Sequence, residues 1–176
     1  MKAIMYLASL TLIVSGCSSP DKPVAEVAAP ASTITLPYTA IYSSNVNQDI
    51  SDEDLLMVLK SYKDWETGDM KSLRSAFGDS LEYNGWDGTY YKGPSETLIQ
   101  TWGPSRDSIS SVKIDMAVWT KNNFPDIGEK NITVWYTETD TYKDGKVKKF
   151  DMQDINAVKD GKISWYAQYR RPYKTK

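Results

Sequence analysis

The second half of the chain reads as a series of long strands joined by tight turns. Apolar and polar residues alternate along Val112 to Trp119, so one side of that strand must be buried. Asp144-Gly145 and Asp160-Gly161 each stand between two strand-like runs, and Asp-Gly favours tight hairpin turns. An antiparallel meander is the expected result. Its predicted strands cover residues 112–119, 131–142, 147–158 and 162–170.

Three helices are predicted before this meander. Ser51 followed by Asp54 resembles a capping box, and apolar residues recur at helical spacing over 55–65. Asp69 can cap a short second helix, and Pro94 suits the first turn of a third, PSETLIQTW, where its missing N–H costs nothing. The predicted fold class is α+β, with three N-terminal helices packed in the concave face of a curved, mostly antiparallel sheet.

The residues between the second and third helices are predicted to form a brief strand and a loop. The strand is SLEYNGW, residues 80–86, and the glycines after it favour a loop that ends at Gly93. The pattern contains neither a parallel βαβ unit nor a Gly-rich phosphate-binding loop. Nothing in this region therefore predicts a nucleotide site.

The chain begins with a segment typical of an export signal. Lys2 is followed by an apolar run from Ile4 to Val14. Eleven residues at a helical rise of about 1.5 Å cover only about half of a hydrocarbon core of about 30 Å. Residues 1–16 are therefore predicted to be a signal peptide rather than a membrane span.

The end of this segment, Val14-Ser15-Gly16-Cys17, resembles the lipobox of bacterial lipoproteins. The resemblance implies lipidation of Cys17, which would attach the protein to a membrane of the bacterial cell envelope, and Ser18 favours the outer membrane over the inner one. An ordinary signal peptide with an accidental cysteine is the alternative. Residues 17–46, rich in Ser, Pro and Ala, are predicted to be a flexible tether, and residues 47–176 the folded domain.

The amino-acid composition excludes several kinds of catalytic and binding site. The chain has no histidine, so neither a Ser-His-Asp nor a Cys-His mechanism can be built. Its single cysteine excludes an intramolecular disulfide and a thiolate metal cluster. The formal net charge is −2 and the charges are mixed, which provides no basic stripe for nucleic acid. No metal, cofactor or nucleic-acid partner is predicted.

The folded part contains four short motifs in the order WETGD, FGDSLEYNG, KGPSETL and DGKI. With these motifs in this order, the chain from about Ser51 to Tyr169 resembles the SnoaL-like and nuclear transport factor 2-like (NTF2-like) superfamily. The resemblance implies a sheet wrapped into a cone by helices, often with a pocket inside, and often a homodimer formed through the sheet. The superfamily includes ketosteroid isomerase, polyketide cyclases and plain binding modules. Function must therefore be argued from the pocket.

The resemblance to ketosteroid isomerase identifies one candidate acid, but the positions of the general base and the tyrosine that act with it carry other residues. In that branch an acid seven positions before the glycine of the last hairpin donates a hydrogen bond to a developing oxyanion, and Asp154 stands at that distance from Gly161. The base position falls on Asn84, whose amide cannot accept a proton. The tyrosine position falls on Ser61, with Tyr62 about 100° away around the helix. Asp154 is a candidate catalytic residue, with a structural role as the alternative, and the missing base weighs against an enzyme.

The chain contains six tryptophans and twelve tyrosines, which suit the walls of an apolar pocket as well as core and interface packing. Glu138 shares a strand face with Tyr136, which favours an inward position for this acid. We expect a pocket for a small apolar or amphipathic ligand, bound without turnover. The alternatives are an isomerase- or cyclase-type enzyme using Asp154 with Tyr62 or Glu138, and a dimerisation or protein-interaction module. The predicted pocket residues are Asn84, Tyr62, Trp102, Tyr136, Glu138, Asn156, Trp165 and Tyr169.

Overall fold

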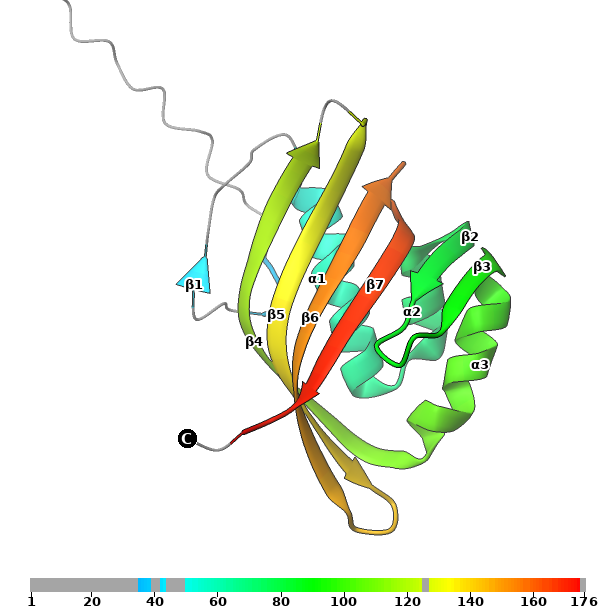
Figure 1. The fold of residues 1–176 in the computed structure, drawn as a ribbon, viewed down its shortest axis with the longest axis vertical. Coiled ribbons are helices and arrows are strands. Elements are labelled where there is room, and N and C mark those ends of the chain that lie inside the picture. The colour runs from blue at the N-terminus through cyan, green and yellow to red at the C-terminus, as the bar shows by residue number, and fades with distance from the viewer. Residues whose placement is uncertain (1–34, 39–41, 44–49, 125–126, 175–176) are drawn as a thin grey trace, which may run out of the picture. The chain divides into compact units, whose positions relative to one another are not determined.

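The computed structural model describes residues 35–38, 42–43, 50–124 and 127–174 (Figure 1). The predicted signal peptide, Cys17 and much of the predicted tether lie outside these residues. The described part has three helices, which are α1 (Asp52–Thr67), α2 (Met70–Ala76) and α3 (Ser95–Asp107). Its strands are β1 (Tyr42–Ser43), β2 (Phe77–Asn84), β3 (Tyr90–Pro94), β4 (Ile109–Phe124), β5 (Glu129–Tyr142), β6 (Val147–Lys159) and β7 (Lys162–Pro172).

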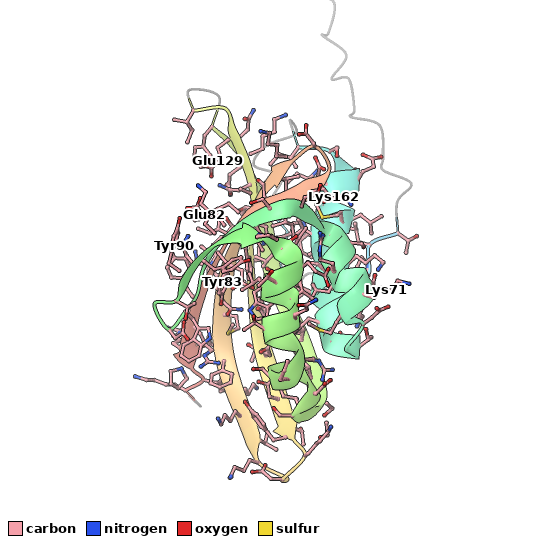
Figure 2. All side chains as sticks on the ribbon, turned by 90° about the vertical axis from the view of Figure 1, so that its right-hand side faces the viewer. Lys71, Glu82, Tyr83, Tyr90, Glu129 and Lys162 are labelled. Atoms are coloured by element: carbon pink, nitrogen blue, oxygen red, sulfur yellow. The ribbon has the colours of Figure 1, made fainter. Side chains whose placement is uncertain are left out.

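The strands form one curved sheet in the order β1-β4-β5-β6-β7-β2-β3. Strands β4 to β7 are the predicted meander, each antiparallel to the next. β2 runs parallel to β7 and continues the sheet, and β3 pairs antiparallel with β2. Figure 2 places Glu129, at the start of β5, and Lys162, at the start of β7, near the same end of the sheet. The mixed α+β architecture of the prediction is confirmed.

The helices cover one face of the sheet (Figures 1 and 2). α1 begins where predicted, because the Ser51 side chain accepts a hydrogen bond from the Asp54 N–H at 3.0 Å. It ends at Gly68, whose φ of 79° is the left-handed conformation that glycine tolerates best. Asp69 caps α2 through the Ser72 N–H at 2.9 Å. Leu59 and Val58 on α1 and Ile132 and Val134 on β5 are fully buried between the helices and the sheet.

The structure differs from the sequence prediction in three elements before the meander. β2 covers residues 77–84, where a strand over 80–86 was predicted. Residues 90–94 form β3, where a loop was predicted; Tyr91 pairs with Tyr83, and tyrosine is a residue that favours strands. α3 continues past Trp102 to Asp107 although Pro104 lacks an N–H, and the Pro104 carbonyl accepts a hydrogen bond from the Ser108 N–H at 3.2 Å at the end of the helix.

Two pieces of the predicted tether contact the domain. The Tyr38 hydroxyl bonds Glu66 on α1 at 3.1 Å, and Leu36 packs against the core. β1, residues 42–43, pairs parallel with β4. Contacts with the domain therefore begin before the predicted boundary at residue 47. Among the described residues no helix is both long enough and apolar enough to cross a membrane.

Candidate functional site

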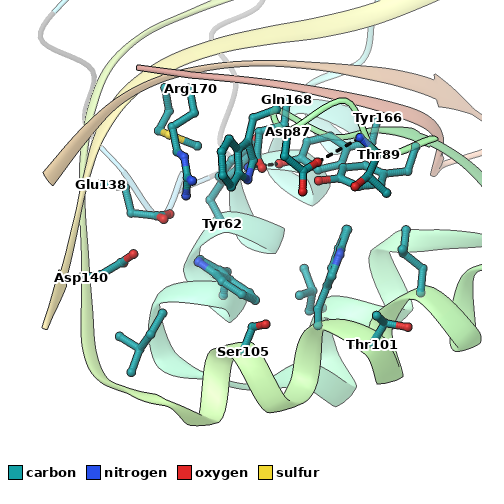
Figure 3. A pocket seen from close by; sticks show the side chains of 18 of the residues that line it. Tyr62, Asp87, Thr89, Thr101, Ser105, Glu138, Asp140, Tyr166, Gln168 and Arg170 are labelled. Carbon is teal, nitrogen blue, oxygen red and sulfur yellow. Dashed lines mark hydrogen bonds between the residues drawn. The ribbon is translucent and has the colours of Figure 1, made fainter. Parts of the chain in front are cut away.

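A cavity of about 640 Å³ lies between the sheet and helices α1 and α3 (Figure 3). Alternate residues of β5 and β7 form one wall because successive strand residues point to opposite faces. Ser105 and Thr101 on α3 lie across from them, and the β2–β3 turn contributes Asp87 and Thr89. The cavity is therefore built by segments from most of the described chain.

Aromatic rings form the wall near β2, and we call Tyr83, Trp102 and Tyr166 the aromatic wall. Tyr83 stacks on Tyr166 with ring centroids 5.5 Å apart. Trp102 meets Tyr83 edge-on at 5.3 Å and Tyr166 at 6.2 Å. Such mutual packing fixes the ring positions and presents apolar surface with a few hydroxyl groups. This part of the cavity suits an apolar or aromatic group.

Asp154 on β6 is fully buried behind the cavity and is held by three tyrosines. The hydroxyl groups of Tyr62, Tyr136 and Tyr166 donate to its Oδ2 at 3.0, 2.9 and 2.7 Å. Burial raises the pKa of Asp154 to about 7, although the tyrosine hydrogen bonds act in the opposite direction. Its Oδ1 atom has no hydrogen-bond partner within the described chain. All three tyrosines line the cavity, so the carboxyl group reaches a ligand only through their hydroxyls.

Two amides complete this tyrosine network. Asn156 Nδ2 donates to the Tyr62 hydroxyl at 3.0 Å and to the Ile132 carbonyl at 3.1 Å. Gln168 Nε2 donates to the Tyr166 hydroxyl at 3.0 Å. Both tyrosine hydroxyls therefore accept one bond and donate another, which fixes their orientation and favours the ionised carboxylate.

A second group of acids, which we call the acid end, lies at the other side of the cavity and consists of Glu138 and Asp140 on β5 (Figure 3). Burial, followed by the charge of Asp140, raises the pKa of Glu138 to about 8. Burial also raises the pKa of Asp140, while the charge of Arg170 acts to lower it. The Arg170 guanidinium lies over the Trp86 ring, 3.1 Å from its centroid, and 4.3 Å from that of Phe150.

The structure places four predicted pocket residues in the cavity lining, namely Tyr62, Trp102, Tyr136 and Glu138. Asp154 and Asn156 lie directly behind the lining tyrosines. Although the sequence argument placed Tyr62 one position away from the expected tyrosine, its hydroxyl bonds Asp154. Ser61 lines the cavity too, but its hydroxyl donates to the Val58 carbonyl at 2.7 Å.

Asn84, Trp165 and Tyr169 were wrongly predicted to line the pocket. In β2 it is Tyr83 that faces the cavity, so its neighbour Asn84 points to the opposite face of the sheet. In β7 the register with β6 shifts between Ile163 and Trp165, where β7 carries one extra residue. This bulge moves the inward face from odd to even positions, so Trp165 and Tyr169 lie on the outer face.

The sequence reasoning missed several lining residues, namely Tyr166, Gln168 and Arg170 on β7, and Trp65 and Trp86 elsewhere. Asp140 also lines the cavity, as its position on the strand face of Tyr136 and Glu138 indicates. The three β7 residues could not be assigned to the inner face without knowledge of the bulge. Within the described chain no cluster of acids and cysteine has the geometry of a metal site.

This architecture, a meander extended by β2 and β3 and covered by three helices around a cavity, is the NTF2-like α+β fold. The chain matches no protein-family model and no curated protein sequence. It is similar in structure to an NTF2-like protein from Anabaena variabilis, with a TM-score of 0.59 and 14% identity over 73% of this chain and 97% of that one.

Two further solved structures show what the fold can host. An epoxide hydrolase of M. tuberculosis matches with a TM-score of 0.57 and 14% identity, over 69% of this chain and 84% of its own. A protein with a ketosteroid isomerase-like fold from Catenulispora acidiphila, solved in complex with trimethylamine, matches with a TM-score of 0.52 and 14% identity, over 64% of this chain and 83% of its own. The fold thus occurs in both enzymatic and ligand-binding proteins.

Proposed function

We propose that this protein binds a small amphipathic molecule in the cavity without converting it. The proposal rests on the division of one cavity of about 640 Å³ into an aromatic wall and an acid end. Specific ligand sites combine apolar surface with a few polar groups that fix the orientation of the ligand. A volume of this size accommodates a molecule of roughly drug-like dimensions.

Binding without turnover is favoured by the position of Asp154. Its side chain is completely buried and three tyrosine hydroxyls separate it from the cavity. A general base must come within hydrogen-bond reach of the proton that it removes. In this arrangement the carboxylate orients tyrosine hydroxyls rather than meeting a substrate.

The binding domain belongs, in this proposal, to a lipoprotein of the bacterial cell envelope. Support comes from the lipobox-like sequence Val14-Ser15-Gly16-Cys17. Lipid chains on Cys17 would keep the domain at a membrane surface, and Ser18 after the cysteine favours the outer membrane over the inner one. Metabolic labelling with a palmitate analogue tests this step, and a label that persists in Cys17→Ser argues against it.

The binding function is tested by native mass spectrometry and tryptophan fluorescence on the purified full-length chain. We expect a non-covalent adduct, or fluorescence changes with small amphipathic probes, because tryptophans line the cavity. Ser105→Trp adds bulk inside the cavity and should abolish binding. Gln100→Trp places the same residue on an exposed position of α3 outside the lining and should leave binding intact. Equal binding by both variants would contradict a ligand in this cavity.

An isomerase- or cyclase-type enzyme is the second candidate, favoured by the pKa of about 7 at Asp154. A carboxyl group poised near neutral pH suits proton transfer, and a tyrosine could carry the proton to the cavity. Such an enzyme should catalyse exchange of the α-protons of cyclic ketone probes in D₂O. The exchange should disappear in Asp154→Asn. No catalysed exchange in the wild type removes this candidate.

A further inference from the structure

The acid end presents two buried carboxyl groups that form no ion pair with a described basic side chain, although Arg170 lines the same cavity and its charge acts on both. Glu138 and Asp140 are 8% and 4% exposed, and both line the cavity. Among the described residues, no ion pair joins either group to a basic side chain. Oδ1 of Asp140 is also without a hydrogen-bond donor there. A buried carboxylate oxygen without a donor is costly, so a ligand that supplies an N–H group gains from the contact.

The cations nearest to the acid end are engaged by other groups. Arg170 on β7 is stacked between the rings of Trp86 and Phe150. The Arg106 guanidinium on α3 donates to the carbonyls of Trp65, Glu66 and Ile109. Lys148 on β6 lies 4.9 Å from the centroid of the Tyr142 ring. These cations lower the pKa of Asp140 through space, but none supplies its missing hydrogen bond.

Other groups that face the acid end include aromatic rings and further titratable side chains. Trp65 on α1 and Tyr142, two positions after Asp140 on β5, line the same part of the cavity. Protein cations already lie over both rings: Arg106 over Trp65 at 5.9 Å and Lys148 over Tyr142 at 4.9 Å. Trp65 also hydrogen-bonds the side chain of Glu138. The remaining titratable groups near the acid end are Tyr62, Asp87, Tyr136, Asp154 and Tyr166. Two buried carboxyl groups, one of them with an oxygen that lacks a donor, form a setting that favours an organic cation over an anion.

We propose that the ligand is an organic amine whose protonated nitrogen is held by Glu138 and Asp140. An ammonium group carries three N–H donors, enough to bond the free Oδ1 of Asp140 and the carboxyl group of Glu138 together. The apolar body of the amine then lies toward the aromatic wall of Tyr83, Trp102 and Tyr166. This inference rests on the proposed binding function and names the chemical class of its ligand.

The affinity for an amine depends on pH in a defined direction. Burial raises the pKa of both acids, to about 8 for Glu138, so Glu138 gains negative charge as the pH rises over the range around 8. An alkylammonium group has a pKa of about 10.4, as in lysine, and stays charged over that range. Amine binding should therefore strengthen as the pH rises, while binding of a neutral probe should not.

Three probes with one common body test the inference on the full-length chain, namely 4-phenylbutylamine, 4-phenylbutanol and 4-phenylbutanoate. Affinities are measured by calorimetry at pH 8. We expect the amine to bind at least about tenfold more tightly than the alcohol, as for one charge-assisted hydrogen bond. Equal affinity of amine and alcohol, or tighter binding of the carboxylate, would overturn the amine assignment and leave the binding function standing. Failure of all three probes to bind would overturn both.

Variants locate the amine within the cavity. Asp140→Asn should weaken 4-phenylbutylamine about tenfold and change 4-phenylbutanol by less than about twofold. Glu138→Gln provides a second, independent variant with the same expectation. Asp115→Asn removes an acid that is exposed on β4 and paired with Lys113, and it should change neither affinity. Thermal unfolding verifies that each variant is folded. Unchanged amine binding in both folded cavity variants contradicts the proposal.

Discussion

At Asp154, three hydroxyl groups act against the cost of burying a charge. Burial outweighs their hydrogen bonds, and the pKa rises from 3.8 to about 7. The folded protein therefore holds this proton more tightly than the unfolded chain does. The contribution to stability is fully present below the unfolded pKa, near 3.8, and is lost as the pH rises through about 7. Glu138, with a pKa raised to about 8, acts in the same direction.

Asp154→Asn should flatten the dependence of stability on pH. Asparagine keeps an oxygen for the tyrosine hydroxyls but cannot ionise. A pKa shift from 3.8 to about 7 corresponds to about 4 kcal/mol at 1.36 kcal/mol per pKa unit. As the pH rises from 4 to 8, the free energy of unfolding of the wild type should therefore fall by up to about 4 kcal/mol relative to that of Asp154→Asn.

Urea denaturation at several pH values between 4 and 8 provides the measurement. Asp115→Asn is the matched control, because it removes an exposed carboxyl group and should run parallel to wild type. If the free energy of unfolding of Asp154→Asn also followed the wild-type dependence on pH, the raised pKa of Asp154 would be refuted.

At the scale of elements, Arg106 joins α3 to the end of α1. Its side chain is 8% exposed and donates to the carbonyls of Trp65 at 2.7 Å and Glu66 at 2.9 Å. It also bonds the Ile109 carbonyl at the start of β4 at 3.1 Å. The last carbonyls of a helix lack intrahelical partners, so a cation there satisfies them and complements the helix dipole. One side chain thus holds together two of the helices that enclose the cavity.

Arg106→Ala should destabilise the domain by about 3 kcal/mol, because three hydrogen bonds to partly or fully buried carbonyls are lost. Chemical denaturation measures this change. Arg171→Ala is the control; its guanidinium is 80% exposed in a surface pair with Asp151 and should contribute less than about 1 kcal/mol. Similar losses in the two variants would refute the anchoring role of Arg106.

The sequence predicts elements well where the signal is local. Ser51, Gly68 and Asp69 mark helix ends through their own side chains or backbone, and the structure confirms all three. The inward face of β7 was not predictable, because the bulge near Ser164 arises from pairing with β6. For the same reason Glu138 could be assigned to the inner face from its own strand, whereas Trp165 was assigned to the wrong one.

At the scale of the whole domain, the two faces of the sheet carry different side chains. The inner face holds the tyrosine network and the acid end. Trp135, Trp165 and Tyr169 lie on the outer face, and Tyr169 is 56% exposed. Trp135 and Trp165 are half-buried, and aromatic groups that stay partly exposed on one face are typical of interaction surfaces. We propose that this face pairs with a second copy of the chain, as the resemblance to NTF2-like proteins implies.

Trp165→Arg should convert a homodimer into a monomer, because a buried arginine without a partner opposes association of two outer faces. Sedimentation velocity of the full-length chain at several concentrations measures the change. Val147→Arg places the same charge on an exposed position of the β5–β6 hairpin and should leave the dimer intact. Trp165→Arg should also keep the wild-type affinity for the amphipathic probes, because Trp165 lies outside the cavity lining. A wild type that sediments as a monomer at all concentrations would remove the dimer, while loss of probe binding in Trp165→Arg would show that the two faces act together.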